Sequence, residues 1–305
     1  MPKLNVQQNN QNVIQAFKNA LAIGNLKGII ASDGNHNFST AGSNRNLLDN
    51  PWFTVNQRGV NGTITNGQYG LDRWMAGGGT VTMATGGITL GAGNSYALQR
   101  PADPSIFNGK TVTLSVMTSD GVVESGTAVA QTGSAKTVRT ANFELCIGYT
   151  AYNSFYFYNI SSSAKTVIAA KLELGSVSTL ANDAPPDYGE ELRKCQRYFV
   201  RMYGAMTYFQ LAIGYCSSTT SRAVFMVTCP VPLAKTATIS FSNLIASDAS
   251  GTTYPISNVV ITRSQRDTNA VQVLFGLSTP MPALGTPCTL QTANASGYLD
   301  INADL

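Results

Sequence analysis

The stretch 109–121, GKTVTLSVMTSDG, carries the pattern that recurs over most of this chain. Val112, Leu114 and Val116 alternate with polar residues, which is the period of a strand that buries one face. A glycine bounds the run at each end, and Ser-Asp-Gly is a turn-forming sequence. The stretch therefore predicts one strand of a half-buried antiparallel sheet.

Short strands punctuated by glycine extend on both sides, from residue 46 to about 178. The runs 79–91 (GTVTMATGGITLG), 141–160 (ANFELCIGYTAYNSFYFYNI) and 166–177 (TVIAAKLELGSV) all show them. In the second run, Phe155 and Phe157 alternate with Tyr156 and Tyr158. Turn signals about every ten residues favour a sandwich or jelly roll. We expect a jelly-roll module over residues 46–180.

A second β module is predicted over residues 181–305. Pro185 and Pro186 interrupt the strand pattern, and the charged stretch 190–202, EELRKCQRYFVRM, follows. Leu192, Cys195, Tyr198 or Phe199, and Met202 have helical spacing, which predicts a short helix between the modules. Strand runs then resume in 221–244. The predicted fold class is all-β, with a jelly roll or β-sandwich, a second β-sandwich and a short N-terminal helical arm.

The arm comprises residues 1–45 and differs in composition from the rest. Four apolar residues recur at helical spacing within 11–26, QNVIQAFKNALAIGNL, and predict a short amphipathic helix: Val13, Ile14, Phe17 and Leu21. The lead-in QQNNQN is polar, and 32–46, SDGNHNFSTAGSNRN, reads as a loop. Such an arm orders by packing on another surface, so we expect these four residues to anchor the chain to a particle.

Composition excludes several classes of partner. Charged residues are 12% of the chain, and the net charge of +4 comes from scattered residues with no basic run, so no nucleic acid is expected. No window is long and apolar enough for a membrane span, and the start lacks a secretory pattern, so we expect folding in a cytoplasm. The cysteines are widely spaced and predict buried thiols: Cys146, Cys195, Cys216, Cys229 and Cys288.

The sequence offers little catalytic chemistry, and we predict that the chain is not an enzyme. Its single histidine, His36, stands in a glycine and asparagine loop, which leaves no histidine-dependent triad elsewhere. The glycine groups at 77–80 and 86–93 lack the Lys-Ser/Thr of a phosphate loop. A carboxylate pair for glycoside hydrolysis remains an alternative, because two such groups need only meet in space.

Two sets of residues are candidates for binding a ligand. Aromatic rings can stack on sugar faces while their polar atoms bind hydroxyls, and the candidates are Trp74, Tyr149, Tyr152, Tyr156 and Tyr158. The alternative for these residues is cross-strand packing. Asp49, Asn50 and Glu173 bracket the first module and could supply oxygen ligands to a structural calcium, or else be turn and surface residues. No other cofactor is expected.

Several ordered motifs resemble a recurrent architecture of bacteriophage fibre proteins. NLLDNPWFTVNQRG at 46–59, YGLDRWMAGGGTVTM at 69–83, the run 96–121 and AAKLELGSV at 169–177 resemble the carbohydrate-binding-module-like jelly roll of phage tail-fibre and virion-fibre proteins. EELRKCQRYFVRMYG at 190–204 and AVFMVTCPVPLAKTATISF at 223–241 resemble the C-terminal β module that commonly follows it. The resemblance spans about residues 46–245.

This resemblance implies a virion protein that is folded and assembled in the host cytoplasm. It implies a homotrimer whose arm attaches to a tail, collar or capsid protein and whose β heads bind bacterial surface polysaccharide. The alternative is a purely structural head or collar fibre, or a capsid decoration protein, without receptor binding. Trp52, Phe53 and Trp74 would then pack the core, with Arg58, Asp72 and Arg73 at its rim.

Overall fold

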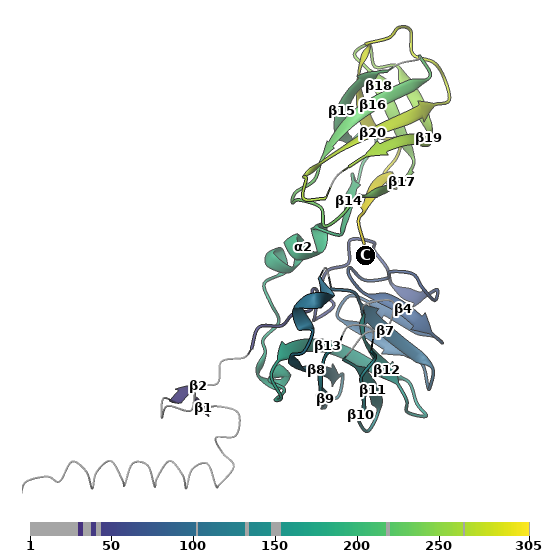
Figure 1. Cartoon of the computed structure of the whole chain (residues 1–305). Helices are drawn as coiled ribbons and strands as arrows, with labels where there is room; N and C mark the ends of the chain where they lie inside the picture. The colour runs from purple at the N-terminus through teal and green to yellow at the C-terminus, as the bar shows by residue number, and fades with distance from the viewer. Residues whose placement is uncertain are drawn as a thin grey trace, which may run out of the picture.

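The computed structural model describes residues 30–32, 38–40, 44–101, 103–131, 134–147, 154–217, 220–264 and 266–304, and it confirms the all-β class (Figure 1). Within these ranges the helical elements are α2 (Tyr188–Gln196) and the two 3-10 turns at Pro104–Phe107 and Leu180–Asn182. None of them has the length and apolar character needed to cross a membrane.

The first module is a sandwich of two antiparallel sheets. One has the order β10-β11-β12-β7-β4 and the other β3-β5-β6-β13-β8-β9. Their bounds are β3 (Gly62–Ile64), β4 (Met75–Gly78), β5 (Val81–Ala84), β6 (Gly87–Leu90), β7 (Ser95–Gln99), β8 (Thr111–Thr118), β9 (Val123–Val129), β10 (Thr137–Arg139), β11 (Phe143–Cys146), β12 (Phe155–Asn159) and β13 (Lys165–Leu174).

The core of this module follows the alternation in the sequence. Val112, Leu114 and Val116 of β8 are buried, and so are Phe155 and Phe157 of β12 on the opposite sheet. The expectation that β8 is half-buried was wrong, because Thr113 and Ser115 are buried as well and bond to Gly175 and Ser178 of the segment after β13. The side chains from the two inner faces form one cluster, which is how a sandwich excludes water. Strand β13 lies between β6 and β8 in the interior of the six-stranded sheet.

The second module consists of a closed barrel and a small sheet. The barrel order is β15-β16-β20-β19-β18-β21, and the three-stranded sheet is β14-β22-β17. Their bounds are β14 (Phe199–Tyr203), β15 (Gln210–Cys216), β16 (Arg222–Thr228), β17 (Thr238–Ser242), β18 (Leu244–Asp248), β19 (Thr253–Arg263), β20 (Ala270–Leu277), β21 (Pro287–Thr292) and β22 (Tyr298–Asn302). We expected a second sandwich, but these six strands form a closed barrel. Register shifts in β15 and β19 accompany the curvature that closure needs.

The helix between the modules is confirmed, but it is shorter than its apolar spacing predicted. The carboxylate of Asp187 accepts a hydrogen bond from the Glu190 backbone N–H at 3.0 Å and caps the start of α2. The helix ends at Gln196, and Phe199–Tyr203 form strand β14. Val200 pairs with Ile301 of β22, so sheet pairing overrides the helical spacing that reached Met202.

The arm is described only in part. The predicted anchoring residues Val13, Ile14, Phe17 and Leu21 lie outside the described residues. Strand β1 (Ile30–Ser32) pairs antiparallel with β2 (Phe38–Thr40), so part of the segment predicted to be a loop is a two-stranded ribbon. The five cysteines are free and buried, as predicted.

The two modules meet around a buried charge cluster, called the joint below: Arg58, Arg73 and Asp304. The C-terminal end of the chain lies between the modules in Figure 1, and Asp304 is the last described residue. Its carboxylate is paired with Arg58 and lies 3.6 Å from Arg73 Nη1. The side chains of Arg73 and Asp304 are 0% and 3% exposed. Two carboxylate–guanidinium pairs therefore join the first module to the last described residue of the second.

Aromatic rings of the second module cover the two guanidinium groups of the first. Arg73 lies over Tyr198, 3.4 Å from the ring centroid, and Arg58 lies over Phe199 at 3.6 Å. A guanidinium stacked on a ring in a dry site gains cation–π attraction and is screened from water. The joint thus combines charge pairing with ring packing, and it fixes how the modules meet.

We expect Asp304→Ala to lower the free energy of unfolding by about 1.5–3 kcal/mol, because it removes the carboxylate that two guanidinium groups share, although Asp49 and Asp72 still pair with them. The control is Arg139→Ala, which breaks the exposed Arg139–Glu144 pair at 2.8 Å and should cost at most about 1 kcal/mol. Urea unfolding checks both. Equal losses for the two variants would contradict this account of the joint.

Candidate functional site

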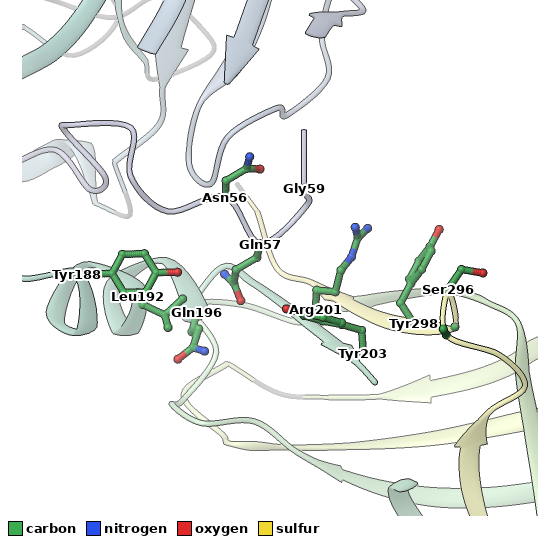
Figure 2. Close-up of a pocket in the computed structure, with 12 residues that line it drawn as sticks. Asn56, Gln57, Gly59, Tyr188, Leu192, Gln196, Arg201, Tyr203, Ser296 and Tyr298 are labelled. Carbon is green, nitrogen blue, oxygen red and sulfur yellow. The ribbon is translucent and has the colours of Figure 1, made fainter. Parts of the chain in front are cut away.

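A cleft of about 540 Å³ lies at the joint, between the two modules (Figure 2). Four segments line it: the loop 56–59 of the first module, helix α2, strand β14 and the turn leading into β22. Its lining residues are Asn56, Gln57, Gly59, Tyr188, Leu192, Gln196, Arg201, Tyr203, Ala295, Ser296, Gly297 and Tyr298. Its volume lies within the range of about 300–1,000 Å³ that small-ligand sites occupy.

Gln57 holds the first-module wall of the cleft in place. Its backbone N–H and its side-chain amide both donate to the Asp72 carboxylate, at 2.7 and 2.8 Å. The same amide donates to the Phe199 carbonyl oxygen of β14 at 2.8 Å. Burial raises the pKa of Asp72, and Arg58 and Gln57 oppose that shift. The loop is therefore bonded to both modules, which keeps the wall rigid.

Three tyrosines supply aromatic surface to the cleft. Tyr188 stands at the start of α2 and is 54% exposed, and Tyr203 stands at the end of β14 and is 64% exposed. Tyr203 is the direct cross-strand partner of Tyr298 on β22. The hydroxyl groups of Tyr188 and Tyr203 have no hydrogen-bond partner among the residues that the structure describes, so a ligand can reach them.

Arg201 is the charged residue of the cleft lining, and its charge is already neutralised. Nε and Nη2 donate to the two oxygens of Asp300, both at 2.7 Å, and Nη1 donates to the Arg58 carbonyl oxygen at 2.8 Å. These bonds to Asp300 raise the pKa of Arg201. The guanidinium also lies over Tyr298, 4.3 Å from the ring centroid. A cleft with tyrosine, amide and serine groups and no free charge suits an uncharged, hydroxyl-rich ligand.

The first module carries a second aromatic surface, which we name the tyrosine face: Tyr96, Tyr156 and Tyr158. They are half-buried on the outer face of the five-stranded sheet. The Tyr96 ring lies 5.5 Å from Tyr156 and 6.3 Å from Tyr158, and it is nearly parallel to Tyr158. Burial, with a further contribution from Cys146, raises the pKa of Tyr156, so its hydroxyl stays neutral.

Tyr156 and Tyr158 lie half-buried on the same face of β12, and their contact with sugar stays a prediction, but Trp74 does not lie with them. Trp74 is 1% exposed and belongs to the core, where its ring lies 5.2 Å from Phe53 and 5.5 Å from Phe157. Its indole N–H donates to the Asn50 carbonyl oxygen at 2.9 Å. The prediction that Trp74 contacts a sugar was therefore wrong. Its ring is buried in the core, and its indole N–H already has a hydrogen-bond partner there. Tyr149 and Tyr152 lie outside the described residues.

The three candidate calcium ligands each have another partner. Asp49 Oδ2 accepts from Arg73 Nε at 3.1 Å, and the Asn50 side chain bonds to the backbone of Val55. The Glu173 carboxylate accepts from Thr179 and lies 3.8 Å from the Lys171 ammonium. No group of metal-ligating side chains occurs in the described ranges. A calcium ion at these residues remains a prediction.

A buried lysine neutralises the carboxylates near Glu173. Lys171 is fully buried, and its ammonium lies 2.8 Å from Asp183 and 2.8 Å from the Thr179 hydroxyl. The segment after β13 is thereby bonded to the outer face of that strand. This cluster positions the chain that leads to α2 and so supports one wall of the cleft.

Sequence reasoning missed the cleft because its walls come from segments far apart in the chain. The sequence analysis singled out the stretches that contain NQRG at 56–59 and EELRKCQRYF at 190–199, but nothing in either showed that they meet. Tyr96 was also missed. Its side chain points to the outer face of the sheet, whereas that of the next residue, Ala97, points into the core. Strand β7 has five residues, too few to show an alternation of apolar and polar residues.

Comparison of the chain with protein-family models, with curated proteins and with solved structures finds no match.

The packing of the tyrosine face can be tested through Gly77, the cross-strand partner of Tyr96. A Cβ at Gly77 would lie 2.0 Å from the Tyr96 ring. We expect Gly77→Ala to cost about 1–3 kcal/mol of unfolding free energy, and much less in a Tyr96→Ala background. Gly87→Ala, where the nearest atom lies at 3.4 Å, is the control. Equal costs in both backgrounds would show that Tyr96 does not lie over Gly77.

Proposed function

We propose that this chain is a bacteriophage virion fibre protein that binds an uncharged polysaccharide of the host surface in the cleft between its modules. The observation that carries the proposal is the lining of that cleft, which combines tyrosines and amides with no free charge. Sugar sites use aromatic rings for the apolar faces of a pyranose and polar groups for its hydroxyls. The resemblance to phage fibre proteins supplies the biological setting.

Binding at one cleft would be weak, and multiple copies would compensate. A half-open cleft leaves part of a sugar in water, so few polar contacts are fully desolvated. Copies held together raise the effective concentration of the remaining sites once one site is occupied. We propose a homotrimer for this reason and because the resemblance implies it. The N-terminal arm would attach the trimer to a tail, collar or capsid protein.

The tyrosine face is the second proposed sugar contact, through Tyr156 and Tyr158. Its rings are partly exposed, but both pack against Tyr96 of the neighbouring strand β7. Their cross-strand packing, like the burial of Trp74, favours the alternative function of a structural head or collar fibre or capsid decoration protein. In that case the first module is a spacer.

We propose binding without hydrolysis. Asp300, the carboxylate that Arg201 brings beside the cleft, is held in a two-bond ion pair. Hydrolysis of a glycosidic bond needs an acid and a second carboxylate that are free to act on the substrate. Release of reducing ends from host polysaccharide would contradict this part of the proposal.

Tyr188 gives the most direct test of the cleft. We expect Tyr188→Ala to weaken binding of the purified chain to host cells by about tenfold, because it removes a ring from the cleft wall. Tyr188→Phe keeps the ring and is the matched control, with an expected change of about threefold or less from the lost hydroxyl. Saturation binding to susceptible and resistant cells measures both. Unchanged binding for Tyr188→Ala would contradict the cleft as the site, and absence of binding to either strain would favour the structural fibre.

A further inference from the structure

A second pocket, of about 360 Å³, is lined by a different face of helix α2 from the one that lines the cleft. Leu192 and Gln196 are four residues apart, share one helix face and line the cleft. Lys194 stands on the opposite face and Arg197 follows the helix end, and both line the second pocket. The segment 45–49, at the start of the first module, lines it as well. We name it the arginine pocket, after Arg197 and the arginine at position 45.

The two arginines of this pocket have free charges on fixed backbones. Within the described ranges, the exposed side chains of Arg45 and Arg197 have neither an ion pair nor a hydrogen bond. The Arg197 carbonyl accepts from the Ala234 N–H at 2.7 Å. Asn46, next to Arg45, donates from its side chain to the Ala170 carbonyl of β13 at 2.9 Å. Both guanidinium groups are therefore held near the pocket and are free to bind an anion.

The other charged side chains of the pocket leave it positive. Asp49 is paired with Arg73 at 3.1 Å, and Lys194 is paired with Glu191. Asp103 is the carboxylate that remains, and it is exposed and caps the 3-10 turn that follows it. Two unpaired guanidinium groups thus face one carboxylate that already accepts hydrogen bonds, so the lining favours a negative ligand.

A buried hydroxyl in the same lining also points to a ligand. Tyr198 is 4% exposed, and its ring lies against Arg73. Its hydroxyl has no hydrogen-bond partner among the residues that the structure describes, although buried polar groups ordinarily have one. Burial raises the pKa of Tyr198, and the nearby charge of Arg197 opposes that rise. The hydroxyl therefore stays protonated and can donate to an anion.

Stabilisation of the helix explains only part of this arrangement. Cations after the last turn of a helix interact favourably with its dipole, which accounts for Lys194 and Arg197. It does not account for Arg45, which comes from the other module, or for the Tyr198 hydroxyl. A ligand that accepts from both modules accounts for all of these groups.

We propose that the arginine pocket binds a carboxylate or phosphate group of a small ligand. Guanidinium groups match the paired oxygens of both anions. Arg45 and Arg197 pair with these oxygens from the two modules, and the Tyr198 hydroxyl donates to one of them. The arginine pocket and the cleft have no lining residue in common, so this proposal stands whether or not the cleft binds a sugar.

The test is isothermal titration calorimetry of the full-length chain with four probes: inorganic phosphate, glucose 6-phosphate, glucuronate and glucose. We expect at least one anionic probe to bind about tenfold or more tightly than glucose, and to bind more weakly as salt is raised. Tighter binding of glucose 6-phosphate than of inorganic phosphate would identify the ligand as an acidic sugar, and equal binding would identify it as the free anion. Either result supports the anion site.

The variant Arg45→Gln/Arg197→Gln should raise the dissociation constant of the anion by about tenfold or more. The matched control is Arg139→Gln/Arg222→Gln, which removes two exposed arginines, one from each module, that do not line the pocket. It makes the same change in net charge and should leave the dissociation constant unchanged. Equal losses for the two variants, or anions that bind no better than glucose, would overturn the proposal.

Tyr198→Phe tests the buried hydroxyl separately, because it keeps the ring that lies against Arg73. We expect it to weaken anion binding by about tenfold, the usual effect of losing a hydrogen bond to a charged group. Binding equal to that of the wild type would overturn the role of the hydroxyl. Urea unfolding of each variant shows that it is folded.

Discussion

The arrangement of this chain depends on the pairing of Asp304 with Arg58 and Arg73 at the joint. Removing such charges from water is costly, and the cost is offset only where partners and packing are both present. Here Tyr198 and Phe199 cover the guanidinium groups, and Asp304 lies between them. Arg58 and Arg73 keep Asp72 and Asp49 of their own module as partners, but rotation of one module against the other would break both pairs with Asp304 and leave its carboxylate buried without a guanidinium partner. The pairing thus selects one relative orientation of the two modules.

The cleft follows from that orientation, because neither module forms it alone. Gln57 bonds to Phe199 across the joint, and Arg201 of the second module donates to the Arg58 carbonyl of the first. Arg201 also neutralises Asp300, which leaves the cleft polar but without free charge. The low share of charged residues in the chain, 12%, is consistent with this uncharged lining.

The strands could be predicted because apolar residues occupy one of their faces and polar residues the other. Val112, Leu114 and Val116 alternate with polar residues, and their burial followed. Long-range contacts could not be predicted in the same way. Phe199–Tyr203 has helical spacing but pairs with β22, the second sheet closes into a barrel, and Trp74 finds a hydrogen-bond partner in the core instead of facing solvent. The cleft depends on segments about 140 and 240 residues apart meeting at the joint, which no local pattern records.

A fixed orientation of the two modules can be measured directly by double electron–electron resonance between spin labels on Val177→Cys and Leu284→Cys. Both positions are exposed, one in each module, and the native thiols are buried and will not take the label. Labelled chain is mixed with excess unlabelled chain, so that only distances within one copy are observed. The account predicts a single narrow distance distribution, which broadens when Asp304 is replaced by alanine. A broad distance distribution in the labelled chain that keeps Asp304 would show that the modules move independently, and would contradict a preformed cleft.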